Sequence, residues 1–434
     1  MRLLKVLLSG LISGAVLFPL TSVSVAQENS LYVPLFTYRT GPFGPSGAKT
    51  ANGLLAYFET IMKRDGGVEG RPIVWEECEF GYKTDRGVEC YERLKGKGSL
   101  VSNPFSTGLT YKLVPKAPVD KIPVLSMGYG MSGAADGRWF PWIFNFPTSY
   151  WSQASAFIKY VGAEMGGLEN LKDKKLGLIF LESGYGREPI RLFEALGEKF
   201  GYKFKTWAVP AAQMQDQRSQ WRKIMRWEPD YMFMWGWGNM NATAISRAAE
   251  FGFPMEQFIG VWWSGDEIDT APSAMKAKGS RAATFHAPGA FSKLHKDILK
   301  YAYGGDMELA REHDYGDVLW SRGVFNAMLI AEGIRNAILE FGGEITGEEM
   351  RWGLEHINLT DERLKELGAT GFGKAFKVTC ADHEGNGPVL FQEWDGKKWV
   401  IVSDWIEPMR DVVRPMLEAA AIKEAEKWDY KIRE

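Results

Sequence analysis

Two short segments of the chain combine indole rings, glycines and polar side chains. Trp237 and Asn239 lie within Trp-Gly-Trp-Gly-Asn, while Trp263, Asp266 and Glu267 lie within Trp-Trp-Ser-Gly-Asp-Glu. Glycine lets a backbone approach a ligand closely, and an indole ring offers a broad flat face to pack against it. These residue types predict a surface that holds a small organic molecule.

Motifs for catalysis or metal binding are absent from the sequence. The chain has no Gly-x-Ser-x-Gly elbow, no His-Glu-x-x-His pair and no Gly-Lys-Ser/Thr phosphate loop. Its five histidines are scattered, and no cysteine spacing resembles a zinc site. We therefore predict a binding protein that is not an enzyme, with no catalytic residue, no metal and no cofactor.

The aromatic segments follow strands in a repeating pattern of strand and helix. Units of roughly 25–35 residues fit the strand–helix–strand crossovers of a parallel sheet, so the pattern predicts an α/β fold. In such sheets ligands bind outside the carboxyl ends of the strands, so the residues just after each strand are the candidates. The predicted strands are 31–36, 73–75, 123–126, 176–181, 204–209, 231–235 and 258–261, with short strands later at 376–379, 389–392 and 399–402.

Hydroxyl groups follow two of the earlier strands. Ser106 and Thr107 can direct side-chain hydroxyls and helix N–H groups at a carboxylate, and Tyr129 lies in the next such loop. The same serine and threonine can also simply cap the following helix, and the two roles can coexist.

The N-terminus predicts export. Arg2 and Lys5 precede an apolar run over 6–20, and Ser24-Val25-Ala26 fits a cleavage site, so residues 1–26 read as a signal peptide. The alternative is a membrane anchor, but about 15 apolar residues fall short of the ~20 that span a bilayer. A periplasmic location follows from this interpretation.

The cysteines indicate a possible disulfide, and the net charge restricts the class of partner. Cys78 and Cys90 can form a disulfide in an oxidising compartment, leaving Cys380 unpaired; the alternative is three reduced thiols. A net charge of −2 argues against a nucleic-acid partner. The charged helical tail, 406–434, is expected on the surface without a chemical role.

Several turns together resemble the type I periplasmic binding proteins of branched-chain amino-acid and amide ABC transporters. The resemblance covers roughly residues 30 to 405. Its elements are the Thr40-Gly41-Pro42 loop ending at Gly47, Gly-Gly-Val-Glu-Gly-Arg-Pro-Ile at 66–73, Lys-Ile-Pro-Val-Leu-Ser at 121–126, Tyr185-Gly186, and Thr-Gly-Glu-Glu at 346–349.

The resemblance implies two Rossmann-like lobes with parallel sheets, joined by a three-segment hinge. One lobe would comprise 27–148 and 288–366, and the other 149–287 and 367–405. The lobes would close over a small-molecule ligand, and the protein, expected to be a monomer, would deliver that ligand to a membrane ABC permease. The alternative functions are a ligand-sensing periplasmic receptor component and branched-chain amino-acid binding.

The resemblance also suggests roles for individual residues. Ser106 and Thr107 match a pair that holds the ligand carboxylate in amino-acid binders, and Tyr185 is expected to touch ligand unless it packs at the hinge. An acidic residue near this point holds the α-ammonium group in amino-acid binders, so Asp266 or Glu267 is expected to bind a cation or a hydroxyl group; the alternative is that both are exposed loop acids.

The sequence departs from the branched-chain amino-acid binders at the first loop. Ser46 stands where those proteins usually carry an aromatic residue, and the tryptophan-rich loops are larger than a leucine side chain requires. We therefore expect a larger, flatter ligand, such as an aromatic or hydrophobic acid.

Overall fold

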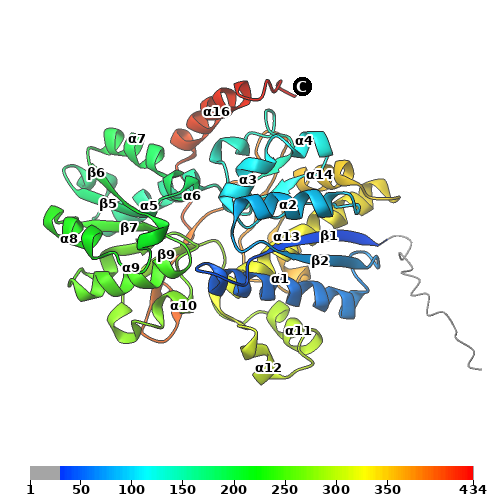
Figure 1. Cartoon of the computed structure of the whole chain (residues 1–434), viewed down its shortest axis with the longest axis horizontal. Coiled ribbons are helices and arrows are strands. Elements are labelled where there is room, and N and C mark those ends of the chain that lie inside the picture. The colour runs from blue at the N-terminus through cyan, green and yellow to red at the C-terminus, as the bar shows by residue number, and fades with distance from the viewer. Residues whose placement is uncertain (1–29, 434) are drawn as a thin grey trace, which may run out of the picture.

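The computed structural model describes residues 30–433. The predicted signal peptide lies outside these residues. No helix within them is long and apolar enough to cross a membrane. Two α/β lobes lie side by side, one built around the early strands and the other around the middle of the chain (Figure 1). The predicted α/β class with parallel sheets is confirmed, whereas the residue ranges assigned to each lobe stay a prediction.

The first lobe is built on a parallel sheet. Strand β1 (Leu31–Thr37) pairs with β2 (Ile73–Glu79), and β3 (Val124–Leu125) pairs with β4 (Ile143–Phe144). Single parallel bridges from Leu35 to Asn103 and from Ser102 to Val124 join the two pairs. The helices of this lobe are α1 (Gly44–Asp65), α2 (Thr84–Lys95), α3 (Thr107–Leu113), α4 (Ala117–Asp120), α11 (Lys293–Tyr301), α12 (Met307–Glu312), α13 (Val318–Phe341) and α14 (Gly347–Glu355), with the short 3₁₀ helix η1 (Ser132–Ala135).

The second lobe contains a seven-stranded sheet in the order β13-β12-β9-β8-β7-β5-β6, in which β12 and β13 run antiparallel to their neighbours. Its strands are β5 (Lys175–Leu181), β6 (Lys203–Val209), β7 (Tyr231–Trp235), β8 (Phe258–Gly260), β9 (Arg281–Thr284), β12 (Leu390–Trp394) and β13 (Trp399–Ile401). Its helices are α5 (Tyr150–Glu164), α6 (Gly184–Arg187), α7 (Ile190–Phe200), α8 (Arg218–Trp227), α9 (Asn239–Glu250) and α10 (Glu267–Thr270).

Helices α1 and α13 form the densest helix pair of the first lobe. A Cβ atom at Gly53 would lie 1.9 Å from the carbonyl oxygen of Trp320, and one at Gly323 would lie 2.0 Å from that of Thr50. Glycine at these two positions therefore lets the backbones touch. The contact holds the start of α13, which lies at the junction of the two lobes, against α1.

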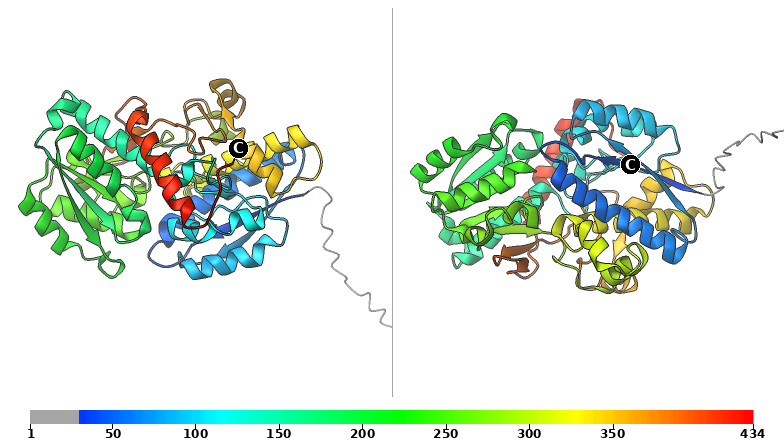
Figure 2. Two further views of the ribbon diagram at one scale, coloured as in Figure 1. Left: turned by 90° about the horizontal axis from the view of Figure 1, so that it is seen from above. Right: turned by 60° about the horizontal axis from the view of Figure 1, so that its bottom comes forward.

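The C-terminal helix α16 (Arg410–Glu426) lies across both lobes (Figures 1 and 2). It packs on η1 of the first lobe and α5 of the second. Arg138 binds Glu418 at 3.0 Å, and Arg410 binds both Asp382 and Glu384. The tail lies on the surface as expected, but these contacts make it a brace between segments far apart in the sequence. The remaining α-helix is α15 (Asp361–Glu366), and the remaining strands are the antiparallel pair β10 (Asn358–Leu359) and β11 (Phe376–Lys377). Four further short 3₁₀ helices are η2 (Leu168–Leu171), η3 (Ala211–Gln213), η4 (Met255–Gln257) and η5 (Ala274–Ala277).

A disulfide joins strand β2 to helix α2 through Cys78 and Cys90, as the sequence predicted, and Cys380 is unpaired. The two cysteines are 12 residues apart. Closing a loop of this size restricts the unfolded chain, so reduction is expected to lower the free energy of unfolding by about 3 kcal/mol. Urea unfolding with and without reductant measures the loss. A Cys380→Ser variant should respond to reductant as the wild type does, and a Cys78→Ser/Cys90→Ser variant should not respond.

A second prediction concerns His295 of α11, which is fully buried beside Phe372 and hydrogen-bonded through Nδ1 to the Ser292 hydroxyl at 2.6 Å. Burial lowers its pKa from 6.5 to about 4. Between these values the unfolded chain binds the proton and the folded chain does not, so this group's stabilisation is present above pH 6.5 and is lost toward pH 4. The loss should reach about 3 kcal/mol relative to a His295→Gln variant. Equal pH dependence of the two proteins in urea unfolding would contradict this assignment.

Candidate ligand-binding site

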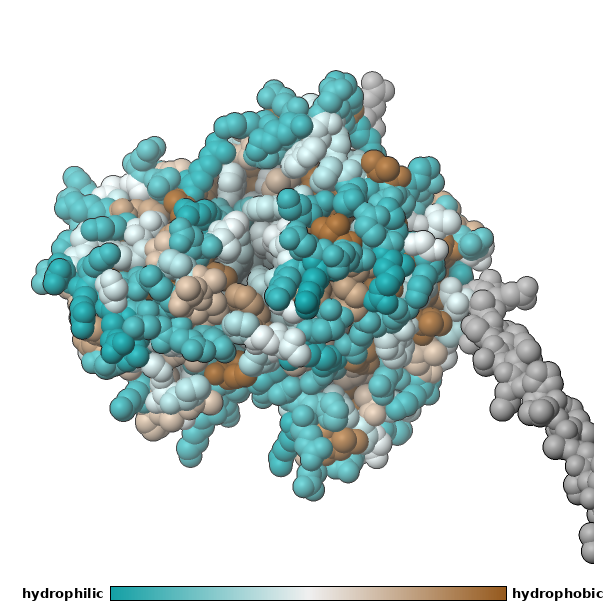
Figure 3. All heavy atoms as spheres, viewed as in Figure 1, coloured by the Kyte–Doolittle hydropathy of each residue, from teal (hydrophilic) through white to brown (hydrophobic). Residues whose placement is uncertain are grey.

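A small cavity lies where the two lobes meet. Its volume of about 20 Å³ leaves room for little more than one water molecule, so the lobes are closed upon one another. The outer face seen in Figure 3 is mainly hydrophilic with scattered apolar residues, whereas the cavity is almost entirely aromatic. Its lining residues are Tyr38, Tyr82, Phe105, Thr107 and Tyr129 of the first lobe and Tyr150, Tyr185, Trp237 and Trp263 of the second.

Strand ends bring most of these side chains together. Tyr38 directly follows β1, Tyr129 follows β3, and Trp237 and Trp263 follow β7 and β8. Because the carboxyl ends of parallel strands share one edge of a sheet, the loops of each lobe converge on that edge. The facing edges of the two lobes therefore enclose the cavity.

Direct contacts across the cavity hold the lobes together. The Tyr38 and Trp237 rings meet edge to face with centroids 6.4 Å apart, and the Tyr129 and Trp263 rings do so at 5.9 Å. The indole N–H groups of Trp262 and Trp263 also both donate to the Gly128 carbonyl oxygen, at 2.8 and 3.3 Å. Separating the lobes would break all of these contacts.

Three of the tyrosine hydroxyls donate their hydrogens to neighbouring protein oxygens, so each keeps lone pairs on its own oxygen. The Tyr38 hydroxyl donates to the Phe105 carbonyl oxygen at 3.0 Å, and that of Tyr185 donates to the Gly236 carbonyl oxygen at 2.8 Å. The Tyr129 hydroxyl donates to Asn103 Oδ1 at 3.0 Å. Burial raises the pKa of Tyr38, Tyr129 and Tyr185 well above the ordinary value, so all three stay neutral.

Thr107 supplies a polar position in the cavity. Its Oγ1 accepts a hydrogen bond from the Gly130 N–H at 3.3 Å, which leaves its own proton to donate. The pKa of Tyr150 is raised by burial, and a hydrogen bond with Thr107 opposes that rise. Ser106 does not line the cavity; its Oγ accepts from the Leu109 N–H at 3.3 Å and caps α3. Ser106 thus takes the capping role considered from the sequence, and Thr107 lines the cavity.

Asp266 and Glu267 lie away from the cavity and bind the first lobe instead. Asp266 is fully buried, lies 3.0 Å from Lys49 Nζ and accepts from the Leu319 N–H at 2.7 Å. Glu267 accepts from the Val318 N–H at 3.0 Å. Both acids therefore accept hydrogen bonds from the N-terminal end of α13, which carries a partial positive charge. Burial and the neighbouring Asp266 charge raise the pKa of Glu267 well above its ordinary value. Neither side chain lines the cavity, and Asp266 is buried, so the alternative of an exposed loop acid is wrong for Asp266.

These two acids and Asp317 bring carboxylate oxygens close enough to hold a metal ion. The Lys49 ammonium already lies among them: it binds Asp317 as well as Asp266. Lys49 has 9% of its side chain exposed, and the surrounding carboxylates raise its pKa against the opposing effect of burial. The cluster, defined by Lys49, Asp266, Glu267, Asp317 and the start of α13, is called the junction cluster below.

Comparison with known proteins now identifies the family. A family model described as periplasmic binding protein matches residues 30–398. The chain belongs to this family. No curated protein among those compared matches the chain.

Solved structures agree with the fold of this periplasmic binding protein. One described as an ABC transporter permease from the Pseudomonas fluorescens group is 36% identical with a TM-score of 0.86, covering 94% of this chain and 99% of that one. A branched-chain amino acid ABC transporter protein from Thermus thermophilus, with bound valine, is 20% identical with a TM-score of 0.73, covering 88% and 98%. A solute-binding protein from R. palustris in complex with benzoate is 17% identical with a TM-score of 0.68, covering 87% and 97%.

Arg322 is a buried cation directly behind the cavity wall of this periplasmic binding protein. Its guanidinium donates to His286 Nε2 at 2.9 Å, to Thr284 Oγ1 at 3.1 Å and to the Trp262 carbonyl oxygen. It also lies 5.2 Å from the Trp263 ring centroid. Burial lowers its pKa to about 9, and the charge of Asp266 opposes that shift, so the side chain is charged at neutral pH. Arg322 thereby ties α13 of the first lobe to the loop after β8.

Five of the nine residues selected from the sequence line the cavity, namely Thr107, Tyr129, Tyr185, Trp237 and Trp263. Asn239 does not: it begins α9, and its backbone N–H donates to the Pro42 carbonyl oxygen at 3.1 Å across the lobes. Four lining residues were not selected, Tyr38, Tyr82, Phe105 and Tyr150. Tyr38 and Phe105 lie in the candidate segments after strands, 38–47 and 102–108, whereas Tyr82 and Tyr150 lie outside the candidate segments. Three of them follow strand positions of the first sheet, and a longer predicted second strand, ending at 79 as β2 does, would have pointed to Tyr82.

Proposed function

We propose that this protein is the solute-binding component of an ABC transporter and that it captures an aromatic or other hydrophobic acid. The observation that carries the proposal is the composition of the cavity, in which eight of the nine lining residues are aromatic and none is charged. Aromatic rings offer large apolar faces that stack on a flat ligand. The Thr107 hydroxyl, paired with Tyr150 in the closed cavity, supplies a neutral donor once an oxygen atom of the ligand replaces Tyr150 as its acceptor.

A free amino acid fits this cavity less well. Its α-ammonium group would be removed from water, and a buried charge is costly without a partner of opposite sign. A ligand carboxylate is also costly to bury, but the Arg322 cation behind Trp263 offsets its charge. The cavity-lining residues offer no carboxylate, and the nearest acids considered from the sequence, Asp266 and Glu267, bind Lys49 and the start of α13. The benzoate complex of the R. palustris protein is consistent with an aromatic ligand in this fold.

Transport would proceed by hinge opening and closing in the periplasm. Because the closed cavity admits about one water molecule, a ring-sized ligand enters only when the lobes separate. Closure then buries the ligand and restores contacts such as those from Trp262 and Trp263 to Gly128. The protein, as a monomer, would present the closed complex to the membrane permease without a chemical step.

Titration of the purified protein tests the ligand class. Benzoate, 4-hydroxybenzoate, leucine and valine are added separately while tryptophan fluorescence and heat are recorded. We expect saturable binding of at least one aromatic acid and a change in emission, because two tryptophans line the cavity. The same ligand should raise the melting temperature as its concentration exceeds the dissociation constant. Tight binding of leucine or valine without binding of either aromatic acid would refute the proposal.

A further inference from the structure

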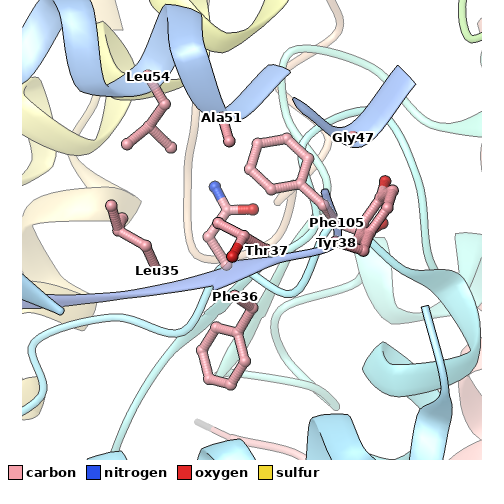
Figure 4. Close-up of a pocket in the computed structure, with 9 residues that line it drawn as sticks. Leu35, Phe36, Thr37, Tyr38, Gly47, Ala51, Leu54 and Phe105 are labelled. Carbon is pink, nitrogen blue, oxygen red and sulfur yellow. The ribbon is translucent and has the colours of Figure 1, made fainter. Parts of the chain in front are cut away.

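A second cavity lies behind the first, inside the first lobe. It lies between strand β1 and helix α1 and has a volume of about 10 Å³. Figure 4 shows Ala51 and Leu54 on α1 facing the strand, with Tyr38 and Phe105 together at one end. Tyr38 and Phe105 line both cavities, so their side chains are the partition between them. We call this second space the rear chamber.

The rear chamber contains two polar atoms without a partner. Thr37 Oγ1 and Asn103 Nδ2 are buried and make no hydrogen bond within the described chain, although both residues line the chamber. Thr37 is 5% exposed and Asn103 is 2% exposed. Asn103 Oδ1 accepts from the Tyr129 hydroxyl, which orients the amide and leaves its NH₂ group as the unused donor. Buried polar groups in native proteins are nearly always paired, so these two atoms indicate an occupant.

The partition itself is held in an unusual conformation. Phe105 has a φ of +45°, in the left-handed region that non-glycine residues rarely adopt. Its N–H donates to the Tyr129 hydroxyl at 2.6 Å, and its carbonyl oxygen accepts from Tyr38. The same tyrosine hydroxyl therefore orients both Phe105 and Asn103. Strained residues of this kind cluster at ligand clamps and switches.

We propose that the rear chamber is a subsite for one substituent of the ligand, and that this substituent carries a hydrogen-bond-accepting oxygen. The inference rests on the proposed function and refines its ligand class to ring acids with a small oxygen-containing group, such as a methoxy or carbonyl group. The substituent passes between Tyr38 and Phe105, its oxygen accepts from the Asn103 amide and the Thr37 hydroxyl, and its carbon packs on Ala51 and Leu54. At about 10 Å³ the chamber has room for about one heavy atom, the oxygen, and a methoxy carbon enters only where Phe105 turns aside.

Paired ligands test the subsite. The 3- and 4-methoxybenzoates are compared with the 3- and 4-ethylbenzoates, which match them in size but lack the oxygen, and with benzoate itself. We expect one methoxy isomer to bind at least tenfold more tightly than its ethyl partner. Equal affinities within each pair would overturn the subsite and leave the chamber to a buried water molecule. Failure of every aromatic acid to bind the wild type would instead overturn the proposed function.

Two variants test whether the preference for the methoxy ligand arises in the rear chamber. Ala51→Ser adds one heavy atom, which fills the chamber, so the preferred methoxy compound should lose at least tenfold in affinity while benzoate, which does not reach the chamber, stays within twofold. Thr37→Val removes one unpaired polar atom with little change of shape, so it should fold as well as the wild type and reduce the methoxy preference at least threefold. If Ala51→Ser does not fold, the Thr37→Val variant decides. An unchanged methoxy preference in the folded variants would overturn the subsite.

Discussion

Replacing Trp237 with alanine is expected to weaken binding of the aromatic ligand at least 100-fold. Trp237 is 4% exposed and lies between the two lobes, with ring centroids 6.4 Å from Tyr38 and 5.6 Å from Trp263. The variant removes an apolar face from the ligand and a contact that forms only on closure. A 100-fold change corresponds to about 2.7 kcal/mol, within the range of buried aromatic anchors at binding interfaces. Calorimetric titration measures it.

Two control variants separate binding from folding. Trp237→Phe keeps an aromatic face and should lose less than tenfold in affinity. Trp207 is a buried tryptophan of similar exposure, 6%, on β6, and it does not line the cavity. Trp207→Ala should lower the free energy of unfolding by about 3 kcal/mol while leaving the affinity nearly unchanged. An equal loss of affinity in Trp207→Ala and Trp237→Ala would show that Trp237 acts only through stability.

Asp266→Ala is expected to lower the free energy of unfolding by about 3 kcal/mol. The change leaves the Lys49 ammonium with less compensating charge and removes the acceptors for the Leu319 and Ile268 N–H groups, which bind Asp266 at 2.7 and 2.9 Å. Removing one member of a buried ion pair is costly because its partner stays buried and charged. Because Asp317 still binds Lys49, we expect the lower end of the usual range. Urea unfolding measures the change.

The junction cluster also joins the lobes, so Asp266→Ala should weaken ligand binding by favouring the open state. Glu267→Gln is the matched control, since an amide oxygen still accepts from the Val318 N–H. A Lys49→Met/Asp266→Leu variant removes both charges and should be more stable than Asp266→Ala. A loss below 1 kcal/mol in Asp266→Ala would contradict the assigned role of the cluster.

Local patterns carried the prediction of the fold and of half of the site. Alternating strands and helices imply a parallel sheet, and the rule that ligands bind at strand ends selected Tyr129, Tyr185, Trp237 and Trp263. The order of strands and helices along the chain is enough to predict that these residues lie at strand ends. The structure confirms the fold class, and it brings the four side chains to one cavity.

Local sequence patterns did not predict which partners the charged residues bind. Asp266 looks like a loop acid until α13 is placed against it, because Leu319 is distant in sequence and Lys49 lies on the first helix. Likewise, nothing in the tail sequence indicates that Arg410 would bind Asp382 and Glu384. An ion pair depends on which two surfaces meet, and that is a property of the packed lobes.

The sequence by itself therefore determined the class of fold, the resemblance to periplasmic binding proteins and the aromatic character of the ligand surface, since periodicity and composition are local properties. Only the tertiary structure decided that the cavity lacks charge, that Asp266 and Glu267 hold the lobes together, and that Thr37 and Asn103 face a second chamber. Burial and pairing arise when segments far apart in the chain come into contact, and they set what each polar group can do.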